Sequence, residues 1–124
     1  MKKIAIGSDP NATVLKNILK SHLLGQGYFV EDFGKDDPVY ANVAIEVAEK
    51  VAAGQFERGV LLCGTGIGVN LAANKVAGAY AVVASDAYSV ERSIKSNNAN
   101  ILTFGSLVTG PVSYTHLRAH ETRI

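Results

Sequence analysis

Residues 59–68 read GVLLCGTGIG, a short apolar run that leads into Cys63 and then into three glycines within five positions. An apolar run that ends at glycines is typical of a buried β-strand. The next residues, 69–75, read VNLAANK and have the spacing of a helix. This stretch therefore predicts a strand, a glycine-rich loop and a helix, which is the repeating unit of an α/β fold.

The rest of the chain repeats this alternation. The pattern predicts strands at 2–6, 28–30, 59–62, 80–83 and 101–104, and helices at 69–75, at 88–96 and in two longer segments. The first of these segments lies between Gly7 and Gly25, and its predicted apolar face is Val14, Leu15, Ile18, Leu19 and Leu23. The second ends before Gly54, and its predicted face carries Val43, Val47 and Val51. Continuously apolar strands joined by helices predict a parallel sheet that is covered on both faces. We therefore expect one Rossmann-like α/β domain with three layers, αβα, in which a five-stranded parallel sheet lies between two layers of helices.

The composition limits the classes of function. The chain has 124 residues, 48% of them hydrophobic, and a net charge of +1 with basic residues scattered along it, so we expect one soluble globular domain that does not bind nucleic acid. No apolar run is long enough for a signal sequence or a membrane span, which predicts a cytoplasmic protein without a membrane partner. Cys63 is the single cysteine and has no Cys or His companion at zinc-ligand spacing, so no structural metal is expected.

The glycine loop has more than one interpretation from its residues alone. Ligands of open α/β sheets bind beyond the carboxyl ends of the strands, and the backbone N–H groups of a loop that opens a helix can converge on an anion there. The loop lacks a complete GxGxxG pattern and a following P-loop lysine, which weakens a nucleotide-binding interpretation. A helix dipole favours a thiolate, so Cys63 could serve as a base. A packing turn beside an inert buried cysteine is the structural alternative.

Five motifs together resemble one family. These are GSD at 7–9, CGTGIG at 63–68, AANK at 72–75, NNAN at 97–100 and FGSLVTGP at 104–111. They are similar to the ribose-5-phosphate isomerase B and galactose-6-phosphate isomerase family, over Met1 to about Pro111. The resemblance implies an aldose–ketose isomerase of phosphorylated sugars that needs no cofactor and works as a homodimer or tetramer with active sites shared between subunits.

The resemblance also implies roles for individual residues. Cys63 matches the base that moves a proton between C1 and C2 through a cis-enediolate, and Thr65 matches a hydroxyl that assists proton transfer at the sugar oxygens. The remaining matches are substrate-binding residues: Ser8, Asp9, Gly64, Gly66, Ile67, Gly68 and Asn97. The backbone amides of 64–68 correspond to the anion hole for the enediolate. Without the resemblance, Asp9 followed by Pro10 would be a helix cap, and Asn97 with Asn98 would be a turn.

Three positions depart from the family pattern and affect the choice of substrate. Pro10 and Ser96 stand where the family has histidines, and Leu107 stands where many members have a phosphate-binding arginine. Opening a furanose ring needs an acid or base near neutrality, which neither proline nor serine supplies. A tetrose 4-phosphate cannot close that ring. Isomerisation of ribose 5-phosphate is therefore the first expectation, and isomerisation of erythrose 4-phosphate to erythrulose 4-phosphate is its alternative. Two alternatives are not enzymes. One is a catalytically silent partner subunit of a paired isomerase chain, and the other is a phosphometabolite- or nucleotide-binding module.

The end of the chain abandons the strand–helix alternation. Residues 112–124 read VSYTHLRAHETRI and resemble translated adapter sequence at the broken end of an assembled gene. The sequence thus predicts an isomerase domain at 1–111 that lacks the family's C-terminal helix, followed by a non-native tail at 112–124. His116, Arg118, His120 and Arg123 in this tail are assigned no role.

Overall fold

The computed structural model describes residues 2–33, 39–84 and 98–107. Five strands form one parallel sheet in the order β2-β1-β3-β5-β4. They are β1 (Lys3–Ser8), β2 (Phe29–Asp32), β3 (Arg58–Cys63), β4 (Ala81–Val83) and β5 (Ile101–Gly105). The helices are a short 3-10 turn, η1 (Pro10–Ala12), followed by α1 (Thr13–Gly25), α2 (Tyr40–Ala52) and α3 (Ile67–Ala73).

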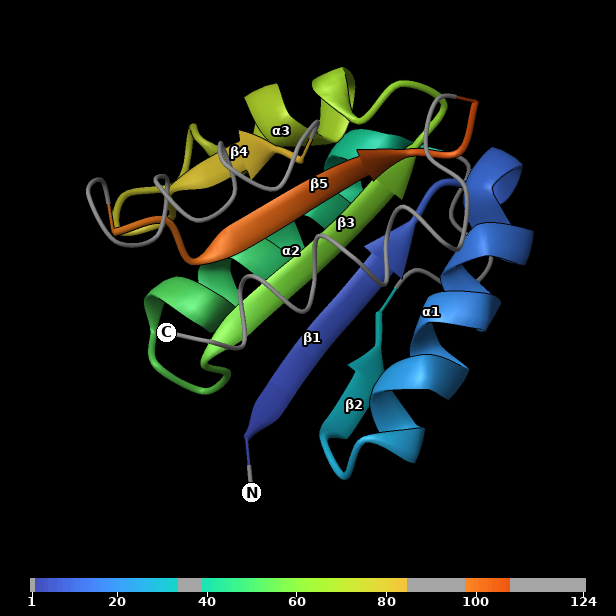
Figure 1. The fold of residues 1–124 in the computed structure, drawn as a ribbon. Helices are drawn as coiled ribbons and strands as arrows, with labels where there is room; N and C mark the ends of the chain where they lie inside the picture. Colours follow the sequence, from blue (N-terminus) through green and yellow to red (C-terminus); the bar gives the residue numbers. More distant parts are fainter. Residues whose placement is uncertain (1, 34–38, 85–97, 108–124) are drawn as a thin grey trace.

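The helices lie on both faces of the sheet, so the predicted three-layer α/β fold is confirmed (Figure 1). One core cluster joins α1 to Ile4, Ile6 and Leu62, and the other joins α2 and α3 to Ala5 and Leu61. All five predicted strands are present, with ends that differ from the prediction by at most two residues. The helix predicted at 88–96 and the tail predicted at 112–124 lie outside the described residues. None of the described helices is long and apolar enough to cross a bilayer.

The topology places a switch point between β1 and β3. These neighbouring strands are parallel, and the chain leaves β1 toward α1 on one face but leaves β3 toward α3 on the other. A crevice beyond the carboxyl ends of two such strands is the usual ligand site of an open α/β sheet. Three backbone hydrogen bonds tie the loops at this end together: Asp9 N–H to Leu62 O at 3.2 Å, Ser106 N–H to Cys63 O at 2.8 Å, and Leu107 N–H to Gly64 O at 3.0 Å.

The buried face of α1 differs from the predicted one. Leu15, Leu19 and Leu23 are buried as expected, but the fourth buried position is Lys16, while Val14 and Ile18 are 77% and 43% exposed. The helix is rotated toward Lys16 because this lysine pairs with Asp32 at the end of β2. Its Nζ lies 2.9 Å from Asp32 Oδ2 and 3.2 Å from Oδ1, and both side chains are 5% exposed. Hydrophobic periodicity could not reveal a charge that is buried because it is paired.

We expect Lys16→Met to lower the free energy of unfolding, because it leaves the Asp32 carboxylate buried without its nearest cation. Removing one partner of a buried pair costs about 3–5 kcal/mol. Lys20 Nζ, at 4.0 Å from Asp32 Oδ2, offsets part of this cost, so the expected loss lies near the lower end of that range. Urea unfolding measures it. The double change Lys16→Met with Asp32→Leu should recover most of the loss, and a double variant no more stable than Lys16→Met would contradict this account.

Candidate active site

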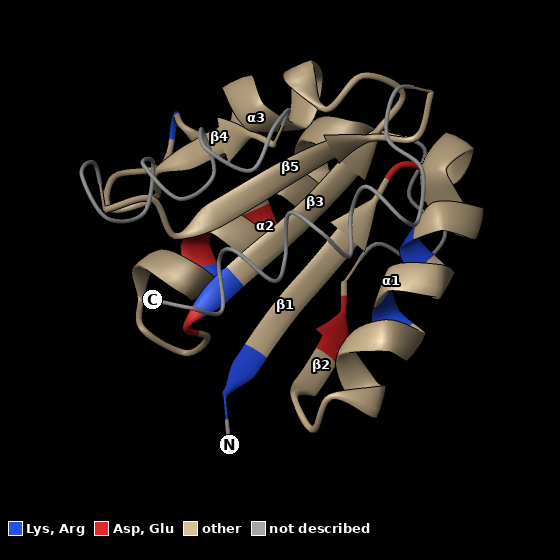
Figure 2. Ribbon diagram, in the orientation of Figure 1, with Lys and Arg blue, Asp and Glu red and all other residues tan. Residues whose placement is uncertain are grey.

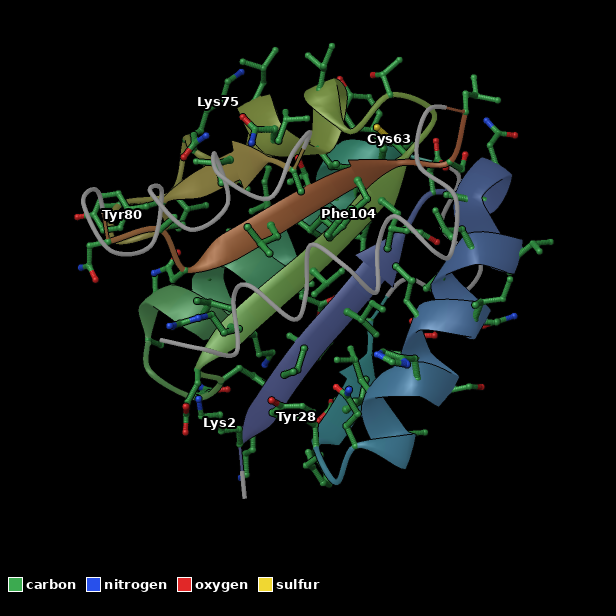
Figure 3. All side chains as sticks on the ribbon, in the orientation of Figure 1. Lys2, Tyr28, Cys63, Lys75, Tyr80 and Phe104 are labelled. Atoms are coloured by element: carbon green, nitrogen blue, oxygen red, sulfur yellow. The ribbon has the colours of Figure 1, made fainter. Side chains whose placement is uncertain are left out.

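Cys63 is the last residue of β3 and lies at the carboxyl end of the sheet, far from Lys2 and Tyr28 at the opposite end (Figure 3). Its side chain is 7% exposed, and its Sγ accepts a hydrogen bond from the Gly66 N–H at 3.2 Å. The Cys63 carbonyl is held by Ser106, as described above. The thiol therefore has a fixed position and a backbone donor directed at its sulfur.

The glycine loop lies directly on the backbone at the end of β5. Gly66 has φ +83, in the left-handed region, and a Cβ on it would lie 2.9 Å from the carbonyl carbon of Phe104. A Cβ on Gly105 would in turn lie within 2.6 Å of the Thr65 backbone. No side chain fits at either position without moving the loop away from the strand. The two glycines thus allow the loop to place Gly66 N–H over the sulfur.

The amides of the predicted anion hole, 64–68, differ in their hydrogen bonds. The Gly66 N–H donates to Cys63 Sγ, and the Ile67 N–H donates to Thr65 Oγ1 at 3.2 Å, so these two amides are used inside the protein. The N–H groups of Gly64, Thr65 and Gly68 have no acceptor among the described residues. A role of these amides as an anion hole stays a prediction. Thr65 is exposed, and its hydroxyl oxygen accepts from the Ile67 N–H, a bond that does not use the hydroxyl hydrogen.

Asp9 and Ser8 have different surroundings. Asp9 Oδ1 accepts from Ala12 N–H at 3.2 Å and caps η1, with Pro10 at the first position of that turn, so the helix-cap interpretation is confirmed. This cap uses one of the two carboxylate oxygens. Ser8 is 1% exposed, and its hydroxyl has no hydrogen-bond partner among the described residues. Ser8 pairs with Leu62, whose side chain lies on the α1 face of the sheet, whereas Cys63 lies on the opposite face. A contact between the Ser8 hydroxyl and a substrate stays a prediction.

The asparagine-rich segment is described only in part. Asn97 lies outside the described residues. Asn98 has φ +57, a left-handed conformation that asparagine tolerates in a turn, and Asn100 accepts from Tyr80 N–H at 2.9 Å and donates to Gly78 O at 3.1 Å. Asn98 and Asn100 thus build the entry to β5. Leu107, where the family pattern has arginine, is 82% exposed, with Cδ1 at 3.5 Å from the position that a Cβ on Gly64 would take.

Sequence reasoning missed two features of the site. Thr103 is fully buried in β5, and its hydroxyl donates to the Gly66 carbonyl at 2.8 Å. The available signal was a polar residue inside the apolar strand ILTF. Tyr40, at the start of α2, packs its ring against the first turn of α3, where a Cβ on Gly68 would lie 2.8 Å from Tyr40 Cε1. Nothing in the local pattern around Tyr40 indicates this long-range contact.

Charge is scarce around the crevice. Figure 2 shows charged residues on α1, on α2, on β2 and at the amino ends of β1 and β3, while α3 and β5 carry none. In the described segments that follow β1, β3 and β5, residues 9–12, 64–68 and 106–107, Asp9 is the single charged side chain. Within the described residues, no group of three or more His, Cys, Asp or Glu side chains could hold a metal ion. The described part of the site presents a thiol, hydroxyls, backbone amides and the Asp9 carboxylate.

A fixed thiol beside backbone amides, at the switch point of a parallel sheet, is typical of an α/β enzyme site. Comparison with known proteins gives the family. The family profile described as Ribose/Galactose Isomerase matches residues 4–119. A D-erythrulose-4-phosphate isomerase of Pectobacterium atrosepticum is 44% identical over 115 residues, which cover 90% of this chain and 76% of that protein.

Two further similarities agree with this match. Ribose-5-phosphate isomerase B of Escherichia coli is 44% identical over 113 residues, which cover 89% of this chain and 76% of that protein. The structure of ribose-5-phosphate isomerase B of Clostridium thermocellum superposes with a TM-score of 0.93 and 37% identity, over 98% of this chain and 84% of that chain. The chain belongs to the ribose/galactose isomerase family of sugar-phosphate aldose–ketose isomerases.

Gly66→Ala should destabilise the protein more than Gly27→Ala does. Both glycines have positive φ, so either alanine costs about 1–2 kcal/mol of backbone strain. Nothing lies within 4 Å of a Cβ on Gly27, whereas a Cβ on Gly66 meets the β5 backbone, which adds about 1–3 kcal/mol. Urea unfolding of the two variants makes the comparison. Equal losses would show that the loop is not held against β5 as described.

Proposed function

We propose that this chain interconverts an aldose phosphate and its ketose without a cofactor, and that ribose 5-phosphate and ribulose 5-phosphate are its substrates. The observation that carries the proposal is the Cys63 thiol, fixed at the end of β3 with the Gly66 N–H 3.2 Å from its sulfur. Family membership supports the reaction class, and the resemblance of CGTGIG to the family motif supports the assignment of the base. The choice of the pentose phosphate as the substrate is a more specific proposal than the reaction class.

In the proposed mechanism the Cys63 thiolate removes the proton from C2 of the open-chain aldose. The electron pair left on C2 forms the C1–C2 double bond, and the carbonyl oxygen on C1 takes the negative charge of a cis-enediolate. The thiol then returns its proton to C1, while a proton moves from the C2 hydroxyl to the C1 oxygen and leaves the C2 carbonyl of the ketose. A positioned base of this kind contributes about 10²- to 10⁴-fold in rate.

The amides of Gly64, Thr65 and Gly68 are the proposed donors to the enediolate oxygens. Each well-placed donor is worth about 3 kcal/mol at the position where charge develops. The Thr65 hydroxyl is the proposed carrier of the proton between the two sugar oxygens, because its oxygen is fixed by Ile67 N–H and its hydrogen is not. The second carboxylate oxygen of Asp9, which the η1 cap does not use, is the proposed partner of a sugar hydroxyl.

A tetrose 4-phosphate is the second candidate substrate, and a specific observation favours it. Pro10 occupies the first position of η1 beside Asp9, so this position offers no imidazole for opening a furanose ring. A tetrose 4-phosphate needs no ring opening, because its 4-hydroxyl is esterified. The two relatives described above, one acting on D-erythrulose 4-phosphate and one named for ribose 5-phosphate, are equally identical to this chain at 44%, so overall similarity does not choose between them.

The decisive experiment compares kcat/KM for ribose 5-phosphate, erythrose 4-phosphate and galactose 6-phosphate, with Cys63→Ser beside the wild type. We expect isomerisation of the pentose, and a loss of kcat of at least about 10²-fold in Cys63→Ser with an unchanged circular dichroism spectrum. A higher kcat/KM for erythrose 4-phosphate would show that the tetrose phosphate, and not the pentose phosphate, is the preferred substrate. Full activity of the folded Cys63→Ser variant would refute the mechanism.

We also propose that the working enzyme is a homodimer or tetramer whose subunits complete each other's sites. Ile67 and Leu71 lie one turn apart on α3, directly after the glycine loop, and both side chains are exposed. Tyr40, which packs on the same helix, is exposed in part as well. Exposed apolar residues that gather beside a site are typical of a protein interface. A partner could also supply the cation for a phosphate group that the described loops lack.

Leu71→Lys should weaken this assembly, because it places a charge in the proposed interface. We expect sedimentation velocity to show a shift toward monomer, with a parallel loss of isomerase activity at low protein concentration. Val14→Lys is the matched control, since Val14 is also an exposed apolar residue but lies on α1. A monomeric wild type with full activity would contradict the proposal.

A further inference from the structure

Thr103 is the one polar side chain of β5 and has no contact with solvent. Its hydroxyl donates to the Gly66 carbonyl at 2.8 Å, while the Val82 carbonyl lies farther away at 3.4 Å. A buried hydroxyl needs a partner, and the nearer of the two acceptors of Thr103 is in the loop. This side chain therefore connects the centre of the sheet to the loop that borders the thiol.

A chain of side-chain hydrogen bonds orients this hydroxyl. Asn70 Nδ2 on α3 donates to Thr103 Oγ1 at 3.5 Å, and Asn70 Oδ1 accepts from Asn74 Nδ2 at 3.1 Å. Asn74 is itself fixed by both backbone groups of Ala81, at 2.9 and 2.8 Å. The single hydrogen of Thr103 Oγ1 has two carbonyls within reach, and that of Gly66 is the nearer one.

Gly66 transmits this restraint to the sulfur. Its carbonyl is held by Thr103, and its N–H donates to Cys63 Sγ at 3.2 Å. Close packing on β5 sets the position of Gly66, and contacts at both of its peptide groups set the orientation of its N–H. If the carbonyl were released, the N–H could turn away from the sulfur. The sulfur would then lose its backbone donor.

We propose that Thr103 is a positioning residue for Cys63: it holds the Gly66 carbonyl and thereby keeps the Gly66 N–H on the sulfur. This inference rests on the proposed role of Cys63 as the base. Thr103 touches no part of the crevice that would bind the sugar, because it is fully buried behind the loop. Its hydroxyl therefore acts on proton transfer and leaves substrate binding unchanged.

The test replaces Thr103 by valine, which keeps the shape and removes the hydroxyl, and by serine, which restores the hydroxyl. We expect Thr103→Val to lower kcat about tenfold, the effect of one hydrogen bond on a rate, with KM within about twofold of wild type. Alkylation of Cys63 by iodoacetamide at one fixed pH should slow by a similar factor. Thr103→Ser should restore both rates.

Two controls separate this role from a loss of stability. Leu102→Val alters the same strand on the opposite face and should lower stability without changing the alkylation rate. Asn70→Ala changes a half-buried residue and leaves Thr103 in place, so it should fold and give a smaller decrease of the same kind even if Thr103→Val does not fold. Wild-type kcat in Thr103→Val or Asn70→Ala, or a rise in KM at constant kcat, overturns the proposal.

Alkylation needs no sugar, so the two proposals can fail separately. If Cys63→Ser keeps full isomerase activity but Thr103→Val still slows alkylation, Cys63 is not the base, although Thr103 controls its sulfur. If Cys63→Ser is inactive while Thr103→Val matches the wild type in alkylation and turnover, the base is correct and the positioning role of Thr103 is wrong.

Discussion

The contact between the backbone of the glycine loop and the backbone at the end of β5 determines the geometry of the whole site. Gly66 and Gly105 leave no space for a Cβ between the two segments, and the Leu107 N–H bonds to the Gly64 carbonyl on the same side. The loop is thus part of the sheet's end and not a free connection. The position of the sulfur relative to the amides follows from the register of β3 with β5, where Cys63 pairs with Gly105.

Much of the fold could be predicted because strongly apolar strands and periodic helices are local signals. The strand before Cys63 and the five-stranded parallel sheet are of this kind. The orientation of α1 could not be predicted in this way, since Lys16 is buried by a partner sixteen residues away. Asp32 is likewise of a residue type that is common in turns. Hydrophobic patterns treat both as solvent-facing, and only their pairing across two elements reverses that assignment.

The part of the candidate site that lies in a sequence motif could be predicted, and the part that depends on tertiary contacts could not. Residues 63–68 form a recognisable motif, and the structure brings Cys63 and the loop together as expected. The motif does not show which acceptor each backbone N–H has. This depends on whether the N–H turns toward the sulfur, the Thr65 hydroxyl or the crevice. Thr103 lies 37 residues from Gly66 in the sequence, so its contact with the loop appears only when β5 is placed beside β3.

Asn74 has a consequence for how copies of this domain can associate. β4 is an edge strand of three residues, and the Asn74 side chain bonds to both the N–H and the carbonyl of Ala81, as a neighbouring strand would. The backbone groups through which another β-strand would add to this edge are therefore already occupied at Ala81. An asparagine side chain thus ends the sheet here and disfavours its continuation from one molecule into the next, which protects a small parallel sheet from edge-to-edge aggregation.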